Sequence, residues 1–234
     1  MHPLAPTIFQ YLKEPHPWLD FQKYNGWQVA LFFTGCVLWL VCYIDTILDI
    51  IRKKMVNIPV AAVLLNFGWE IAACLFFVPD MGKLLVIAYW AWLLCDCFIF
   101  YSLFRFGYKQ MMISFFIKNA HFFVIAGIII SFLSQCTFML QYDLPLAPLT
   151  GYMINLVMSI SFLYLLFVPG FNGYSKVTAW SKFLGTGLIS IMFLTKYPDN
   201  YFLIILYISV ALFDILYIIL LNKKLSGKEL VSLI

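Results

Sequence analysis

Seven long apolar stretches dominate this sequence, and each can cross a lipid bilayer as a helix. They cover residues 27–51, 59–78, 84–104, about 120–140, 151–168, 177–194 and 201–221. At a rise of about 1.5 Å per residue, roughly 20 residues span the hydrocarbon core. Short turns containing proline, glycine, aspartate or asparagine separate most of the stretches. The pattern predicts an all-α integral membrane protein, a bundle of seven transmembrane helices.

The composition favours a membrane domain and excludes a soluble one. Hydrophobic residues make up 64% of the 234 residues and charged residues only 11%, too few to cover the surface of a water-soluble domain. We therefore divide the chain into an N-terminal interfacial segment (1–26), a seven-helix membrane domain (27–222) and a short cytosolic tail (223–234).

The basic residues predict the orientation of the helices. If the N-terminus lies outside, eleven of the 15 lysines and arginines fall on the inner side, Lys182 among them. Positive charge collects on the cytosolic side of membrane proteins, so we expect the N-terminus outside and the C-terminus in the cytosol. Because topology accounts for these charges, we expect no nucleic-acid partner.

Five acids lie within the apolar stretches, and three of them are predicted to lie deepest. Glu70 is 11 residues from the predicted cytosolic end of its helix, Asp96 is 8 and Asp214 is 7, which places all three carboxyl groups in roughly one layer at about 1.5 Å per residue. An ionisable group near the bilayer midplane costs about 2.5 kcal/mol or more on insertion scales, and such groups mark functional sites. We therefore expect Glu70 above all to be functional.

The neighbours of these acids suggest how they are held. Asn66 lies four residues before Glu70, so its amide is predicted to hydrogen-bond the Glu70 carboxyl on the same helix face. Trp69 points about 100° away and is expected to form a wall beside it. Trp92 and Asp96 have the same four-residue spacing.

The last span carries tyrosines beside Asp214, and the first span carries two further acids. Tyr207, Asp214 and Tyr217 share one face of the last span. On the first span, Asp45 lies inside the predicted helix, while Asp49, close to two basic residues, is predicted to be an interfacial anchor.

Several readings fit these residues. Buried acids can hold helices together by hydrogen bonds, or relay protons in a seven-helix small-molecule transporter; a receptor or a purely structural bundle is also open. A retinal protein is excluded because residues 210–221 contain no lysine. Cys95 and Cys97 flank Asp96, but residues two apart diverge on a helix, so we expect no metal site there. The six cysteines are interpreted as packing residues.

The motif Asn66-Phe67-Gly68-Trp69-Glu70 in the second span resembles the Asn-x-x-Trp-Glu signature of the integral-membrane terpene cyclases. This family serves fungal meroterpenoid and indole-diterpene biosynthesis and has bacterial relatives. The similarity extends to chain length, the seven spans and an aspartate in the last span, here Asp214. It implies a multi-pass protein of the cell membrane if bacterial, or of the endoplasmic reticulum if fungal.

The resemblance implies an activity and roles for the residues that match. The activity is acid-initiated cyclisation of a farnesyl or geranylgeranyl chain, with or without an epoxide, on a meroterpenoid or indole-type substrate. Glu70 and Asp214 are the implied catalytic acids, with Glu70 preferred as proton donor and the reverse left open. Asn66 and Trp69 match the motif, and Trp92, Asp96, Tyr207 and Tyr217 are candidates for binding or orienting the substrate.

The chemistry suits these roles. A carboxylic acid in a medium of low dielectric holds its proton near neutral pH and can give it to an alkene or an epoxide. Aromatic faces then stabilise the carbocation; the candidate rings are Trp69, Trp90, Trp92, Phe67, Tyr101, Tyr207 and Tyr217. The aspartate-rich motifs that bind diphosphate and Mg²⁺ in soluble terpene synthases are absent from the sequence, so we expect no metal and no organic cofactor. The expected partners are a hydrophobic prenylated substrate and the lipid bilayer, and the sequence leaves the oligomeric state open.

Overall fold

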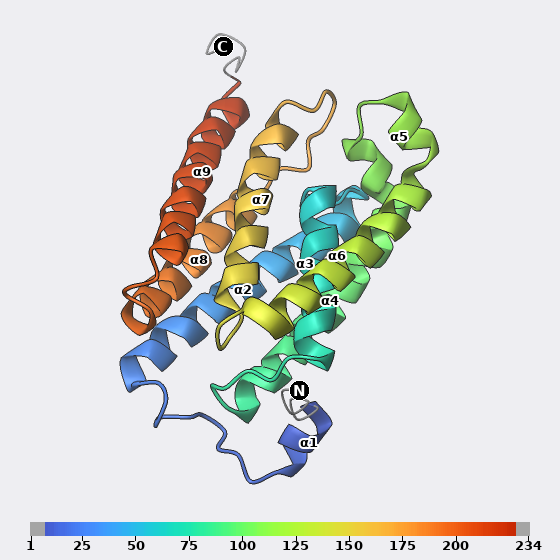
Figure 1. Cartoon of the computed structure of the whole chain (residues 1–234). Helices are drawn as coiled ribbons and strands as arrows, with labels where there is room; N and C mark the ends of the chain where they lie inside the picture. Colours follow the sequence, from blue (N-terminus) through green and yellow to red (C-terminus); the bar gives the residue numbers. More distant parts are fainter. Residues whose placement is uncertain (1–7, 228–234) are drawn as a thin grey trace.

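The computed structural model describes residues 8–227, which form helices joined by short loops (Figure 1). The helices in chain order are α1 (Ile8–Lys13), α2 (Gly26–Lys53), α3 (Val60–Leu75), α4 (Lys83–Phe106), the 3₁₀ turn η1 (Gly107–Gln110), α5 (Ser114–Lys118), α6 (Ala120–Tyr142), α7 (Pro148–Leu166), α8 (Lys176–Lys196) and α9 (Tyr201–Leu225). The predicted apolar stretches correspond to α2, α3, α4, α6, α7, α8 and α9.

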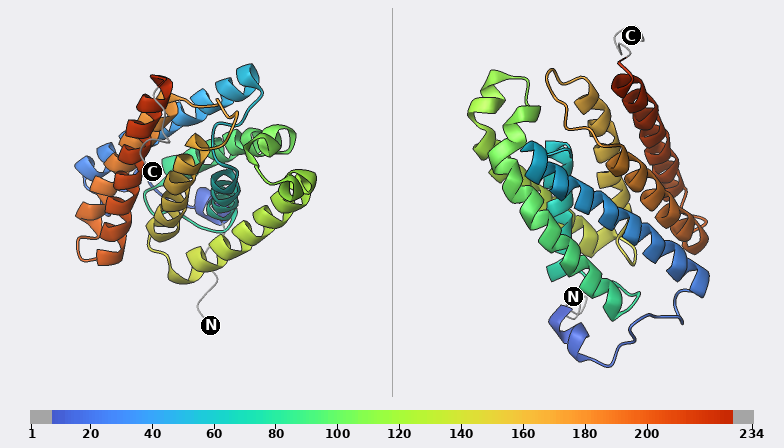
Figure 2. Two further views of the ribbon diagram at one scale, coloured as in Figure 1. Left: turned by 90° about the horizontal axis from the view of Figure 1, so that it is seen from above. Right: turned by 180° about the vertical axis from the view of Figure 1, so that it is seen from behind.

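These seven long helices run up and down in alternation, so that α1 and the end of α9 lie at opposite ends of the bundle (Figures 1 and 2). Within residues 8–227, six of them are long and apolar enough to cross a membrane. The exception is α3, whose 16 residues cover only about 24 Å at 1.5 Å per residue. The structure therefore confirms an all-helical, multi-pass protein, whereas the count of seven spans and their orientation stay predictions.

Helix α3 is shorter than the sequence suggests because it ends before Pro79. Its last helical residue is Leu75, and the amides of Phe76 and Phe77 both bond to the carbonyl of Ala72. A residue that precedes proline is disfavoured in the helical conformation, so the helix closes a few residues earlier. The short helix lies inside the bundle, packed against α4, α6 and α7 (Figure 2). A polar residue on α3 is therefore surrounded by protein.

Small residues let the helices approach closely. A Cβ atom at Gly35 of α2 would lie 2.8 Å from the carbonyl oxygen of Gly185 on α8, and one at Gly68 of α3 would lie 2.8 Å from the backbone nitrogen of Phe132 on α6. Membrane helices associate through such contacts because burial of apolar groups gives them little advantage over lipid. These two glycines fix the positions of α8 beside α2 and of α6 beside α3.

Polar contacts at the helix ends hold α2 against α8. Asn25 and Gln28 form a capping box at the start of α2, and the Gln28 amide donates to the hydroxyl of Thr195 on α8 at 3.1 Å. Near the other end of α2, Asp45 accepts hydrogen bonds from the hydroxyls of Ser175 and Thr178, which begin α8. Asp45 thus joins two helices.

The other acid of α2 is paired at its C-terminal end. Asp49 accepts from Lys53 Nζ at 2.7 Å, the usual geometry of two opposite charges four residues apart on a helix. Its role as an interfacial anchor stays a prediction.

Candidate active site

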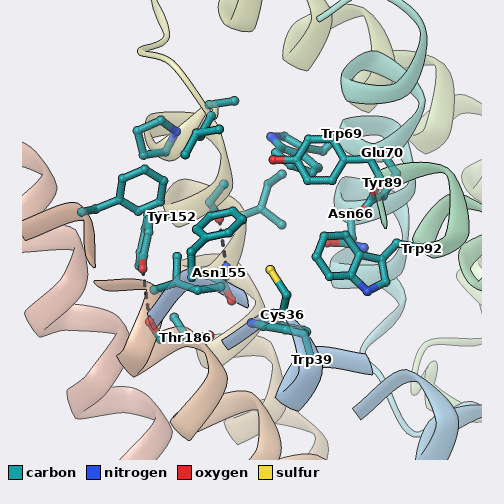
Figure 3. A pocket seen from close by; sticks show the side chains of 18 of the residues that line it. Cys36, Trp39, Asn66, Trp69, Glu70, Tyr89, Trp92, Tyr152, Asn155 and Thr186 are labelled. Atoms are coloured by element: carbon teal, nitrogen blue, oxygen red, sulfur yellow. Dashed lines mark hydrogen bonds between the residues drawn. The ribbon is translucent and has the colours of Figure 1, made fainter. Parts of the chain in front are cut away.

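A pocket lies between α2, α3, α4, α7 and α8 (Figure 3). The space between its walls measures about 730 Å³ when its open part is included. Residues 146–148, where the α6–α7 loop enters α7, border it as well. Its walls are mostly apolar and aromatic, so the pocket suits an organic molecule with a few polar groups.

Glu70 reaches this pocket from the middle of α3. Its side chain is buried, with 3% of the residue exposed, and its Oε2 atom has no hydrogen-bond partner among the described residues. A buried polar atom without a partner is uncommon in proteins. The sequence motif thus places a carboxyl group, with one oxygen unpaired, on a wall of a largely apolar pocket.

Asn66 binds Asp96 and Tyr43, where the sequence predicted a bond to Glu70. Its side-chain nitrogen donates to Asp96 Oδ2 and to the Tyr43 hydroxyl, both at 2.7 Å, and the Tyr43 hydroxyl donates to Asp96 Oδ2 at 3.3 Å. The four-residue spacing allows a bond to Glu70. The amide nitrogen instead points to the Tyr43 hydroxyl on α2 and the Asp96 carboxylate on α4. The expectation that Asn66 orients the Glu70 carboxyl directly was therefore wrong.

Asp96 of α4 is the acid to which the Asn66 amide donates. It is buried, and it lies in a smaller cavity that shares Tyr43 and Asn66 with the main pocket. Glu70 lines the main pocket, while Asp96 lines the smaller cavity, held by two donors. Each acid therefore lines its own cavity, and the two cavities share a wall.

Three aromatic rings continue the wall beside Glu70. The ring centroids of Trp69 and Tyr89 are 5.6 Å apart, and those of Tyr89 and Trp92 are 5.7 Å apart. All three residues line the pocket (Figure 3). Tyr89 was not singled out from the sequence, although it lies three residues before Trp92 and therefore on the same side of its helix. The candidate rings Trp90, Phe67 and Tyr101 do not line the pocket.

Trp69 is held by a chain of hydrogen bonds. Its indole nitrogen donates to the Thr150 hydroxyl at 2.9 Å, and that hydroxyl donates to Asp143 Oδ2 at 2.5 Å. Asp143 also accepts from the backbone amides of Leu149 and Thr150 at the start of α7. The tryptophan of the motif is thus fixed to the first turn of α7.

Asp214 is not on this pocket. It is buried between α8 and α9, where Lys182 Nζ lies 2.6 Å and 2.8 Å from its two carboxylate oxygens and 2.8 Å from the Ser159 hydroxyl. The sequence interpretation counted Lys182 as a cytosolic charge; it is instead a buried residue of α8. A lysine inside an apolar helix is expected to have a buried partner of opposite charge. This expectation, applied to Lys182, could have predicted its pairing with a buried acid such as Asp214.

Tyr207 and Tyr217 also lie away from the pocket lining. The Tyr207 ring packs on Tyr152 with centroids 4.4 Å apart, and the Tyr217 ring packs on Phe162 at 5.1 Å. Both are buried. Of the candidate residues, the structure therefore brings four to one pocket, while Asp96 lines the smaller cavity beside it; the four are Glu70, Asn66, Trp69 and Trp92.

The arrangement supports a particular kind of chemistry. The buried Glu70 carboxyl group belongs to a pocket lined by tryptophan and tyrosine rings. The faces of such rings attract a cation. An acid in such a place can protonate an apolar substrate, and the walls can stabilise the positive charge that results.

Comparison with protein families identifies one match. A family model described as Pyr4-like transmembrane terpene cyclases matches residues 14–223. The match includes the motif on α3, the whole pocket lining and the Lys182–Asp214 pair. No match is found among curated proteins or among solved structures.

Proposed function

The chain belongs to the Pyr4-like transmembrane terpene cyclases, and we propose that it cyclises the prenyl chain of a meroterpenoid or indole-type substrate, with Glu70 as the proton donor. The observation that carries this proposal is the position of Glu70, a buried residue that lines an aromatic pocket and whose carboxyl group has an unpaired oxygen.

The reaction begins with one proton transfer. The Glu70 carboxyl gives its proton to the terminal alkene of the prenyl chain, or to an epoxide oxygen whose C–O bond then breaks. Each internal double bond attacks the neighbouring cation and forms a new C–C bond. Loss of a proton from the last cation restores neutrality, so the rings form without net oxidation or reduction. Glu70 recovers a proton before the next turnover.

The aromatic wall protects and guides the cation. Trp69, Tyr89 and Trp92 form a row beside Glu70, and a desolvated ring contributes about 2 kcal/mol to the stabilisation of a neighbouring cation. Exclusion of water matters equally because water would quench the intermediate. The hydrogen bond from Trp69 to Thr150 keeps the first ring in place.

The two other acids have separate roles in this proposal. Asp96 accepts hydrogen bonds from Asn66 and Tyr43 and so fixes two side chains of the pocket wall. Asp214 acts at a distance because both of its oxygens are bound by Lys182. The proposed donor is therefore Glu70, and Asp214 is a positioning residue.

A transporter is not favoured by the structure or by the family match. A proton relay through Glu70, Asp96 and Asp214 requires the three acids to communicate, whereas Asp214 is closed off in an ion pair outside the pocket.

The decisive experiment is cyclisation in membranes that contain the protein. Wild type and Glu70→Gln would be incubated with farnesylated and geranylgeranylated hydroquinones and indoles, each with and without a terminal epoxide. We expect cyclic product from wild type and a loss of at least about 10²–10⁴-fold in Glu70→Gln, which keeps the shape but not the acidic proton. Glu70→Asp, which keeps the acid on a shorter stem, serves as the matched variant and should retain part of the rate. Cyclisation at the wild-type rate in Glu70→Gln would remove Glu70 as the donor; only linear substrate across the wild-type panel would count against a cyclase.

A further inference from the structure

The side of the pocket opposite Glu70 carries a second set of polar atoms. Asn155 of α7 and Thr186 of α8 line the pocket there (Figure 3). Asn155 Oδ1 and Thr186 Oγ1 are both buried, and neither has a hydrogen-bond partner among the described residues. Together with Glu70 Oε2, three unpaired buried oxygens therefore belong to residues that line one pocket. Buried polar groups are nearly always paired, so these atoms indicate a missing partner.

The hydrogen bonds around Asn155 show whether the missing partner must be a donor or an acceptor. Asn155 Nδ2 donates to the carbonyl of Gly151 at 3.1 Å. Because a carbonyl only accepts, the amide nitrogen is directed to Gly151 and the amide oxygen is left as an acceptor. The Thr186 hydroxyl can accept or donate. A hydroxyl group satisfies both residues by donating to Asn155 and accepting from Thr186, a ring N–H satisfies Asn155, and an ether or a hydrocarbon leaves Asn155 unpaired.

The backbone that presents these two residues is firmly held. The Thr186 carbonyl accepts from the hydroxyls of Tyr152 at 3.2 Å and Ser190 at 2.8 Å, and the Ser159 hydroxyl donates to the Asn155 carbonyl at 2.8 Å. One turn further along, Lys182 joins Ser159 to Asp214. Asn155 and Thr186 therefore belong to a rigid part of the bundle, as a binding site requires.

We propose that Asn155 and Thr186 bind a hydroxyl or ring N–H on the polar head of the substrate, so that its prenyl chain extends across the pocket toward Glu70. This proposal rests on the proposed function, because it assigns the two ends of the pocket to the two ends of a prenylated aromatic molecule. With the polar head bound at Asn155 and Thr186, the substrate has one orientation in the pocket, and the free end of its prenyl chain lies near Glu70. The hydrogen bonds select substrates that carry a donor on the ring.

Binding tests this assignment without cyclisation. The probes are farnesylated hydroquinone, which carries two O–H donors, and its dimethyl ether, which carries none. Trp39, Trp69 and Trp92 line the pocket, so the quenching of intrinsic fluorescence in detergent-solubilised protein reports occupancy. We expect wild type to bind the hydroquinone about tenfold more tightly than the ether, as one hydrogen bond of ordinary strength provides. The variant Asn155→Leu/Thr186→Val should bind both probes equally.

Matched variants separate a local effect from a general one. Thr46→Val removes another buried, unpaired threonine hydroxyl, but Thr46 does not line the pocket, so the tenfold preference should remain. Thr186→Ser keeps the hydroxyl and should also keep the preference. These variants keep the test valid even if the double variant folds poorly.

The outcomes distinguish this proposal from the proposed function. Equal affinity of wild type for the two probes, or binding of neither, overturns the subsite. An unchanged preference in Asn155→Leu/Thr186→Val overturns it as well, even if cyclisation is normal. A preference that those substitutions abolish supports the subsite, and it does so whether or not Glu70→Gln alters the rate of cyclisation.

Discussion

Lys182 Nζ lies 2.6 Å from one carboxylate oxygen of Asp214 and 2.8 Å from the other, and both residues are buried. The aspartate of the last span is therefore a bound anion between α8 and α9, with Ser159 of α7 as a third member of the cluster. A residue so engaged can be essential without touching the substrate, because its removal leaves a charge in the protein interior.

The pair leads to a prediction about stability. Asp214→Asn leaves Lys182 buried without its counter-charge, and we expect a loss of about 3–5 kcal/mol in the free energy of unfolding. Lys182→Met/Asp214→Leu removes both charges and should recover most of that loss. Thermal unfolding in detergent measures the stability, and the cyclisation assay is run on the same samples. If the double variant is stable but inactive, Asp214 takes part directly in the reaction.

The hydrogen bonds of Asn66 predict a selective kinetic effect. Asn66→Leu removes the donor to Asp96 and to Tyr43, whereas Tyr43→Phe removes the Tyr43 hydroxyl as acceptor from Asn66 and as donor at 3.3 Å but leaves the bond from Asn66 to Asp96. We expect Asn66→Leu to lower kcat by about tenfold or more, the equivalent of about 1.4 kcal/mol, and Tyr43→Phe to lower it less. Steady-state kinetics provides the measurement. An equal fall in kcat for the two variants would contradict the central role given to Asn66.

The contact between Trp69 and Thr150 predicts a change at the aromatic wall. Thr150→Val takes away the acceptor of the indole N–H and one donor to Asp143, so we expect a stability loss of about 1–3 kcal/mol. The tryptophan emission should also shift, because Trp69 loses a polar neighbour. Trp69→Phe in the Thr150→Val background is the control: it should abolish the shift. A shift that persists there must come from another tryptophan.

The packing of α3 on α6 predicts that one glycine cannot be enlarged. A Cβ at Gly68 would lie 2.8 Å from the backbone nitrogen of Phe132, so Gly68→Ala should cost about 1–3 kcal/mol and disturb the helix that carries Glu70. Gly187→Ala on α8 is the matched control because a Cβ there meets nothing within 4 Å. Its expected effect is neutral to stabilising. Thermal unfolding of both variants checks the prediction; equal midpoints would refute the close contact.

The sequence predicted the helices well because their signal is local. The predicted helix over 120–140 is observed as Ala120–Tyr142, and the predicted helix over 201–221 is observed as Tyr201–Leu225. The prediction was poorest for α3, where Pro79 closed the helix early and left 16 residues. The motif on that helix also located the pocket, because an acid within an apolar run requires a protein interior around it.

The sequence by itself thus determined that this chain forms apolar helices, that Glu70 lies within one of them, and that Trp69 stands beside it. Only the tertiary structure decided which polar groups meet, Asn66 with Asp96 and Lys182 with Asp214, and which ones line the pocket across from Glu70, namely Asn155 and Thr186. The reason is physical. In a soluble helix the apolar stripe shows which face turns inward, but lipid is as apolar as the protein core, so the pattern along a membrane helix does not fix its rotation. The close contacts at Gly35 and Gly68 settle that rotation, and they exist only once the helices have packed.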